Sequence, residues 1–183
     1  MTRIIAGTAR GRSLDVPKTG TRPTSDRVRE AIFSSLGHRL GNWVNVQVLD
    51  LYAGSAAFSF EALSRGASTA TAIEKDRHAC DVIRKNSMHL QLPLTVVCDD
   101  VSRALLRASS HAYDLVFLDP PYEMQSDALS ANLELLVSNG YVGPDSIVVI
   151  ERSRRSEELN LPEVLSVADD RLHGETRVIT AVW

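Results

Sequence analysis

Short apolar segments alternate with helical segments through the middle of this chain, and this alternation limits the fold more than any other feature. The sequence predicts five strands there, at residues 46–51, 69–74, 94–98, 113–118 and 146–150. Apolar residues recur at helical spacing between them, over residues 56–65, 77–90, 101–108 and 126–138. Strands joined by helices form βαβ units, in which the strands run parallel and helices cover the sheet. We therefore expect an α/β protein with a mostly parallel sheet and helices on both faces.

The C-terminal part of the chain departs from this alternation. Residues 164–167 and 176–182 predict two strands, and no helical segment lies between them. Consecutive strands without a helical crossover pair antiparallel. We expect an antiparallel hairpin that completes a seven-stranded sheet.

The N-terminal part departs from it as well. Residues 3–16 predict two short strands that form a hairpin, followed by a linker rich in Gly, Pro and Thr. Thr24 or Ser25 is suited to cap a helix that ends at Gly37 or Gly41. A small β-hairpin and helix should therefore precede the sheet.

Charge divides the chain into two unequal parts. Residues 1–41 carry eight basic and three acidic side chains, a net charge of +5, whereas residues 42–183 carry twelve and twenty, a net charge of −8. A basic segment on an acidic body is typical of a part that binds phosphates. An ordinary solvated surface is the alternative. Our choices for phosphate contacts are arginines in this segment and two after the fifth strand: Arg10, Arg12, Arg22, Arg27, Arg154 and Arg155.

Composition excludes several classes of protein. The 183 residues fit one domain, and no run of eighteen apolar residues predicts a membrane span. The start of the chain lacks the apolar segment of a signal peptide, so we expect a cytoplasmic protein. Cys80 and Cys98 are expected to be buried free thiols. The five histidines lack ligand spacing, so we expect no metal site.

Acidic and small residues follow the first three predicted strands, where a nucleotide-like cofactor would bind. The turn after the first strand holds Asp50, Tyr52, Ala53, Gly54 and Ser55. Such a turn lets a ligand approach the backbone at a helix N-terminus. It is also consistent with a tight connection alone.

The ends of the second and third strands add acids to this turn. Glu74, followed by Lys75, lies twenty residues after Gly54, the spacing at which an acid binds ribose hydroxyls. Asp99 or Asp100, followed by Val101, is placed to bind an adenine amine. Either aspartate is also suited to cap the next helix.

Asp119, Pro120, Pro121 and Tyr122 end the fourth predicted strand. Two prolines stop the strand because neither has an N–H to donate. A carboxylate, a rigid carbonyl and an aromatic ring held at a strand end would suit a planar substrate with an NH₂ group. A Pro-Pro turn with a packed tyrosine is the structural alternative.

Together these stretches resemble the class I S-adenosylmethionine-dependent methyltransferases, and the whole chain resembles the RsmD family of bacterial 16S rRNA guanine-N2 methyltransferases. The family-specific stretch is Arg22-Pro23-Thr24-Ser25-Asp26-Arg27-Val28-Arg29-Glu30. Further support comes from residues 3–12, 49–55, 61–67 and 119–122. The sequence departs from the family's glycine loop at Ala56 and Ser59, two side chains that could narrow the methionine side of the cofactor site.

The resemblance implies a Rossmann-like methyltransferase domain at residues 42–183 that binds S-adenosylmethionine, releases S-adenosylhomocysteine and needs no metal. Residues 1–41 would form the RNA-binding extension. The substrate would be 16S rRNA, in the small subunit or an assembly intermediate, with no obligate protein partner. The implied catalytic residues are Asp119, Pro120, Pro121 and Tyr122, and the implied cofactor residues are Asp50, Tyr52, Ala53, Gly54, Ser55, Glu74, Lys75, Asp100, Val101 and Asp119.

Two other functions remain open at this stage. The acid-Pro-Pro-aromatic motif also serves adenine-N6 methyltransferases of DNA or RNA, although the short chain has no separate domain to read duplex DNA. A non-catalytic RNA-binding or ribosome-assembly protein with weakened cofactor binding is the second, and Ala56 and Ser59 are its support.

Overall fold

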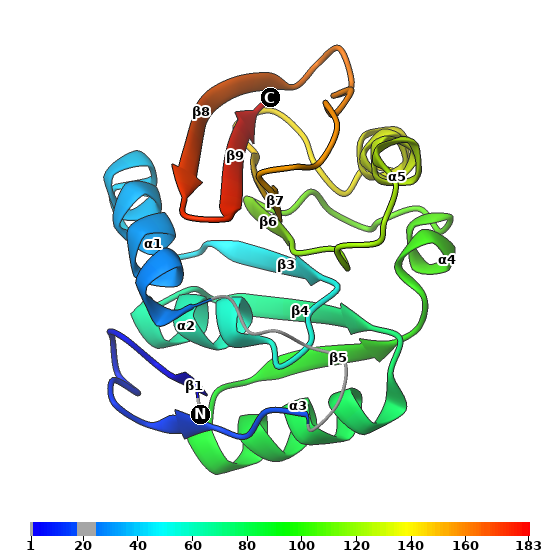
Figure 1. The fold of residues 1–183 in the computed structure, drawn as a ribbon. Coiled ribbons are helices and arrows are strands. Elements are labelled where there is room, and N and C mark those ends of the chain that lie inside the picture. Colours follow the sequence, from blue (N-terminus) through cyan, green and yellow to red (C-terminus); the bar gives the residue numbers. More distant parts are fainter. Residues whose placement is uncertain (1, 18–24) are drawn as a thin grey trace.

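A seven-stranded sheet forms the centre of the protein, in a computed structural model that describes residues 2–17 and 25–183 (Figure 1). Its strand order is β5-β4-β3-β6-β7-β9-β8. Strands β3 to β7 run parallel, and β9 pairs antiparallel with both β7 and β8. The strands are β3 (Gln47–Leu51), β4 (Thr69–Glu74), β5 (Leu94–Cys98), β6 (Leu115–Leu118), β7 (Ile147–Ser153), β8 (Ser166–His173) and β9 (Thr176–Val182). This confirms the α/β fold with a parallel sheet and a C-terminal hairpin.

Several predicted strands have different bounds in the structure: the strand expected at 113–118 is Leu115–Leu118, and the one expected at 146–150 is Ile147–Ser153. The strand expected at residues 164–167 is β8, which begins at Ser166. Leu165 N–H donates to the Pro162 carbonyl at 2.9 Å, so residues 162–165 form a turn instead of a strand. β8 then extends to the turn at Gly174, because its pairing with β9 supplies the hydrogen bonds that its polar sequence does not predict.

The helices lie on both faces of the sheet, as expected (Figure 1). One face packs against α1, α2 and α3, and the other against α4 and α5. The prediction of a helix over residues 101–108 was too long, because α4 ends at Leu105 and the chain leaves the sheet face at the exposed Leu106. The helices are α1 (Asp26–Leu40), α2 (Ala57–Arg65), α3 (Arg77–Leu90), α4 (Val101–Leu105) and α5 (Ser126–Ser138).

Helix α1 is part of the main hydrophobic core. Ser25 caps it by accepting a hydrogen bond from Val28 N–H at 3.3 Å, and Gly41 ends it. Phe33, fully buried, packs against the rings of Phe58 and Phe117, with centroid separations of 6.2 and 5.6 Å. The helix therefore shares the core of the sheet, and a functional boundary at residue 41 stays a prediction.

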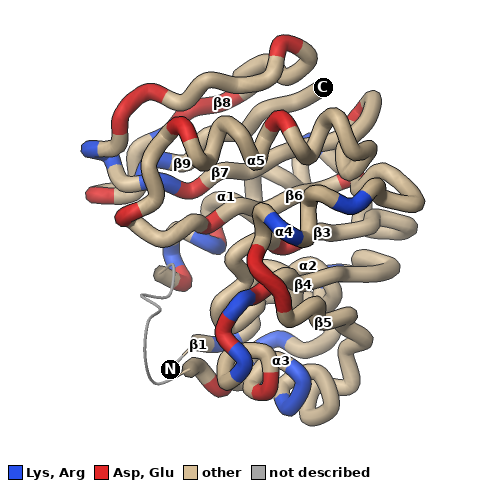
Figure 2. The backbone as a smooth tube through the Cα atoms, turned by 90° about the vertical axis from the view of Figure 1, so that its right-hand side faces the viewer, with Lys and Arg blue, Asp and Glu red and all other residues tan. Residues whose placement is uncertain are grey.

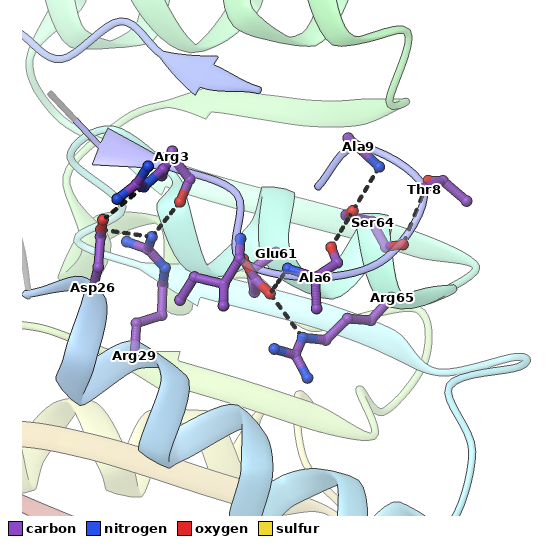
Figure 3. Close-up of polar contacts among 10 residues, drawn as sticks. Arg3, Ala6, Thr8, Ala9, Asp26, Arg29, Glu61, Ser64 and Arg65 are labelled. Atoms are coloured by element: carbon purple, nitrogen blue, oxygen red, sulfur yellow. Dashed lines mark hydrogen bonds and ion pairs between the residues drawn. The ribbon is translucent and has the colours of Figure 1, made fainter. Parts of the chain in front are cut away.

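The first residues of the chain form the expected hairpin, in which β1 (Thr2–Arg3) pairs antiparallel with β2 (Ser13–Leu14). Residues 4–12 connect these strands, and residues 4–9 of this connection lie along α2; we call residues 4–9 the N-terminal strap (Figure 3). Glu61 accepts hydrogen bonds from the N–H groups of Ile5 and Ala6 at 2.7 and 3.0 Å. Ser64 Oγ accepts from Ala9 N–H at 2.9 Å, so the strap is fastened along one side of the helix.

The two cysteines have different environments. Cys80 is buried in α3, where burial raises the pKa of its thiol to about 12. Cys98 is exposed at the end of β5, so the expectation of two buried thiols was wrong for this residue. Strand β5 lies at one of the two edges of the sheet, which leaves its last residue open to solvent. Across the described residues, none of the helices is long and apolar enough to cross a bilayer.

Candidate active site

The ends of four parallel strands meet at one edge of the sheet, which we call the carboxyl edge. Leu51 on β3 pairs with Ile73 on β4 and with Leu118 on β6, and Leu118 pairs with Ile150 on β7. Backbone hydrogen bonds extend these ladders by one step, from Ala53 N–H to Ile73 at 3.1 Å and from Asp119 N–H to Leu51 at 3.5 Å. The acids predicted to bind a ligand are therefore brought to the same edge, as the parallel topology requires.

The turn between β3 and α2 has an unusual backbone. Tyr52, Gly54 and Ala56 all have positive φ angles, of 59°, 56° and 55°. Such conformations are rare for residues with a Cβ and occur where a tight turn must expose its backbone. Ala56 is fully buried and acts as the N-cap residue of α2, so its methyl group packs inside the protein.

Asp50 lies beneath this turn. Its side chain is only 1% exposed, and its Oδ2 accepts hydrogen bonds from Ser59 N–H at 3.1 Å and from Ser59 Oγ at 2.8 Å. Burial raises the pKa of Asp50 to about 7; the Ser59 hydrogen bonds oppose the shift, and the charges of Asp119 and Glu74 add to it. We therefore infer that Asp50 supports the turn from below. Ser59 is turned toward Asp50 in the interior, where its side chain fills space under the turn.

Glu74 connects the turn to the next strand. The carboxylate, 9% exposed, accepts hydrogen bonds from Gly54 N–H at 2.9 Å and from Asp76 N–H at 2.8 Å. A carboxylate has about four acceptor positions, so two remain for hydroxyl groups of a ligand. These residues fit an adenosine ribose. Lys75, next to Glu74, is exposed.

The two aspartates after β5 have separate roles. Asp100 caps α4 by accepting a hydrogen bond from Arg103 N–H at 3.2 Å, and Val101 behind it is buried. Asp99 forms ion pairs with Arg103 at 3.4 Å and Arg107 at 3.1 Å. Figure 2 shows acidic and basic segments of the backbone next to each other around α4. One oxygen of Asp100 receives the cap hydrogen bond, which leaves the other for a ligand at this strand end.

The Asp119–Tyr122 segment follows β6 as an exposed turn. Asp119 is half-buried, Pro120 is buried, and Tyr122 is 57% exposed. The Pro121 carbonyl accepts a hydrogen bond from Met124 N–H at 2.9 Å, which closes the turn. Within residues 2–17 and 25–183, the Pro120 carbonyl accepts no hydrogen bond. A carboxylate and an available carbonyl oxygen are therefore adjacent, next to an exposed ring.

Tyr52, in the turn that follows β3, is held by a hydrogen bond from α5. Asn132 on α5, almost fully buried, donates a hydrogen bond to the Tyr52 hydroxyl at 2.7 Å. Burial raises the pKa of Tyr52 to about 12, so the phenol keeps its proton. Its hydroxyl hydrogen is then available to an acceptor in the site.

The arginines proposed for RNA differ in how they are bound. Arg10 and Arg27 are exposed. Arg12 caps the C-terminal end of α3, with hydrogen bonds to the carbonyls of His89 and, at 3.1 Å, Leu90. Arg22 lies outside the described residues. Arg154 and Arg155 both pair with Glu175, at 3.4 and 3.7 Å.

Three buried polar residues that have a role in the structure were not identified from the sequence. Glu61 and Ser64 hold the N-terminal strap, and Arg152 lies at the carboxyl edge beside α5. An acid between Phe60 and Ala62 in an otherwise apolar helix is the signal that could have identified Glu61. The charges at the end of the apolar strand β7 are a similar signal for Arg152.

Two cavities lie away from the carboxyl edge. One of about 30 Å³ separates α1 from the β8–β9 hairpin and is large enough only for water. Another, of about 680 Å³, lies at the opposite edge of the sheet, beside Asp114, Asp145 and Trp183. Neither adjoins the acids described above, so the chemistry of the strand ends identifies the site.

The sheet and the acids at its carboxyl edge have the arrangement of a Rossmann-like methyltransferase, and the similarity to known methyltransferases shows that the protein is an enzyme of this class. The family described as conserved hypothetical protein 95 matches residues 2–182, so the chain belongs to it. It is similar to ribosomal RNA small subunit methyltransferase D of Escherichia coli strain K12, with 34% identity over 94% of this chain and 85% of that protein. A putative rRNA methyltransferase of Bacillus subtilis, YlbH, is 36% identical over 89% of this chain and 87% of its own length.

A solved structure extends the similarity to the whole fold. The putative methyltransferase yhhF from Escherichia coli matches with a TM-score of 0.87 and 32% identity, covering 98% of this chain and 96% of its own. The RsmD-type resemblance is thereby confirmed.

Proposed function

We propose that the protein methylates the exocyclic N2 amine of a guanine in 16S rRNA, with S-adenosylmethionine as methyl donor and S-adenosylhomocysteine as product. The observation that carries this proposal is the placement of Asp119 and the Pro120 carbonyl at the same edge as Glu74 and the turn at Gly54. The names of the relatives support an rRNA substrate. Small ribosomal subunits or their assembly intermediates in the cytoplasm would then be the partner.

The cofactor would lie on the β3–β4–β5 side of the carboxyl edge. Glu74 would accept from the ribose hydroxyls, and Asp100 with the backbone at Val101 would bind the adenine. The backbone of residues 52–55 would border the methionine part. When bound, S-adenosylmethionine supplies an electrophilic methyl group.

The substrate base would lie on the β6 side. The N2 lone pair of guanine is delocalised into the ring, which makes the amine a poor nucleophile. Asp119 and the Pro120 carbonyl would accept its two N–H bonds and direct the lone pair toward the methyl group. Positive charge develops on the nitrogen in the transition state, so the hydrogen bond to Asp119 strengthens there.

Tyr122 would stack on the base. Base–aromatic stacking contributes about 1–3 kcal/mol, and the 57% exposed ring is accessible to a nucleotide. A base can reach this position only when it is unstacked, which favours a loop or bulge of RNA.

Tritiated methyl transfer tests this function. Small ribosomal subunits from a strain that lacks the enzyme are incubated with protein and labelled cofactor, and the nucleosides are then separated. Label in N2-methylguanosine supports the proposal, whereas label in N6-methyladenosine would replace it with the adenine alternative. Asp119→Asn should lose transfer, while Asp127→Asn, at an exposed acid on α5, should keep it.

Calorimetry with S-adenosylmethionine tests the non-catalytic alternative. Ala56 in the turn and Ser59 in α2 both pack inside the protein, and Glu74 keeps its hydrogen bond to Gly54 N–H, so we expect binding. Absence of binding at millimolar cofactor would favour a scaffold protein.

A further inference from the structure

Arg152 is a buried cation at the carboxyl edge, close to the proposed base site. Ile150 on β7 pairs with Leu118 on β6, and Arg152 lies two residues beyond Ile150. Its guanidinium contacts Ser126, the first residue of α5, with Nη1 and Nη2 at 3.2 and 3.3 Å from Ser126 Oγ. The segment that begins at Asp119 leads directly into this helix. Arg152 is therefore placed next to the substrate side of the edge.

Among the described residues, no acidic side chain lies within ion-pair distance of the Arg152 guanidinium. The residue is 8% exposed, and its hydrogen bonds within the described ranges 2–17 and 25–183 go to a single neutral hydroxyl. Burial lowers the pKa of Arg152, the neighbouring Arg177 lowers it further, and the charge of Glu157 acts in the opposite direction. Arg177 is itself paired with Asp170, at 2.6 Å.

Arg29, the other buried arginine of the described residues, has a counter-charge: it is 1% exposed and pairs with Asp26 at 2.9 Å. The partly buried Arg65 likewise pairs with Glu61 at 2.8 Å. A buried charge without a counter-charge is strongly unfavourable. A guanidinium carries five donors, and the Nη1 and Nη2 groups of Arg152 share one hydroxyl oxygen. An anion at this position would supply a counter-charge and further acceptors.

We propose that Arg152 binds a phosphate group of the substrate RNA beside the base that is methylated. A guanidinium matches phosphate geometry with two parallel hydrogen bonds. The N-terminal end of α5 points to the same place, and its cap residue Gln125 provides no side-chain cap. The cofactor's carboxylate is a poor alternative, because the proposed cofactor site lies on the β3–β5 side of the edge. This inference rests on the proposed RNA substrate.

The test uses Arg152→Met, which keeps the length of the side chain and removes its charge. Replacing a buried, unpaired charge by an apolar group is often stabilising. We expect an equal or higher melting temperature in the absence of RNA, and binding to unmethylated small subunits weakened about tenfold or more. The slope of log Kd against log salt should fall by about 0.7–0.9, the loss of one phosphate contact.

Arg177→Met is the matched control, because Arg177 is the cross-strand partner of Arg152 and is paired with Asp170. It should lower the melting temperature and leave the salt slope unchanged. Arg152→Lys should restore the salt slope with only part of the affinity. A lower melting temperature for Arg152→Met together with an unchanged salt slope would overturn the proposal and give Arg152 a structural role.

The outcomes for this site and for the proposed function are distinguishable. If the wild-type protein does not form N2-methylguanosine, the methylation proposal is refuted. The slope of log Kd against log salt for subunit binding would still decide the role of Arg152. Failure of the wild-type protein to bind subunits at all would refute both.

Discussion

The carbonyl oxygen of Ser64 lies 1.8 Å from the position that a Cβ atom on Gly7 would occupy. Gly7 has a φ of +83°, and the strap passes so close to α2 that only a hydrogen atom fits between them. The neighbouring Thr8 N–H donates to the same carbonyl at 2.7 Å. The N-terminal strap therefore packs tightly against α2, although the sequence predicts only a short hairpin there.

Gly7→Ala should destabilise the protein more than Gly11→Ala does. Both glycines have φ near +80°, but a Cβ on Gly11 meets nothing within 4 Å. Gly11→Ala should lower the free energy of unfolding by about 1 kcal/mol, because alanine disfavours the backbone conformation there. Gly7→Ala should lower it by about 3 kcal/mol or more, because the strap must also move away from α2. Urea unfolding measures both. Equal costs would mean that the strap is not held at this contact.

Glu61→Ala should also destabilise the fold, by about 3 kcal/mol. The fully buried carboxylate accepts from two backbone N–H groups and pairs with Arg65, so its removal leaves all of these donors unsatisfied. Hydrogen exchange should show faster exchange at Ile5 and Ala6. Glu134→Ala, at an exposed position on α5, is the control and should have little effect.

Asp50 should make stability depend on pH. Its pKa in the folded protein is raised from 3.8 to about 7, so the folded state holds the proton more tightly than the unfolded chain. This contribution to stability is complete below about pH 4 and is lost as pH rises through 7, with a total of about 4 kcal/mol. Asp50→Asn should flatten the dependence between pH 5 and 8 in denaturant unfolding. An unchanged slope would show that Asp50 does not titrate there.

Glu74→Gln should weaken the binding of S-adenosylmethionine about tenfold or more. An amide has one acceptor oxygen in place of two, and that oxygen must also serve Gly54 N–H and Asp76 N–H. Titration calorimetry gives the dissociation constant. Asp81→Asn, an exposed acid on α3, serves as the matched control; an equal loss of affinity in both variants would argue against ribose binding at Glu74.

Arg10 and Arg12 should behave differently when replaced by alanine. Arg10→Ala should weaken RNA binding and reduce its salt dependence without changing the melting temperature. Arg12→Ala should lower the melting temperature as well, because Arg12 caps the end of α3. If neither change alters the salt dependence, the hairpin is not a phosphate-binding surface.

The order of elements and most of their bounds could be predicted, because apolar periodicity is a local property of the chain. The predicted strand at residues 69–74 and the helices at 77–90 and 126–138 match β4, α3 and α5 at both ends. Prediction was weakest at β8, whose exposed and polar residues form a strand only because β9 pairs with them. Pairing between strands is not encoded in the local sequence pattern of either strand.

The sequence by itself determined the class of the site, since a parallel sheet brings Glu74 and Asp119 to the same edge whatever the details of packing. The tertiary structure decided what each polar side chain does. Asp50 lies under the turn and Glu61 holds the strap, while the guanidinium of the buried Arg152 contacts a neutral hydroxyl. Burial and partner choice depend on residues far apart in the chain, so a linear pattern identifies a charged residue but not whether its charge is compensated.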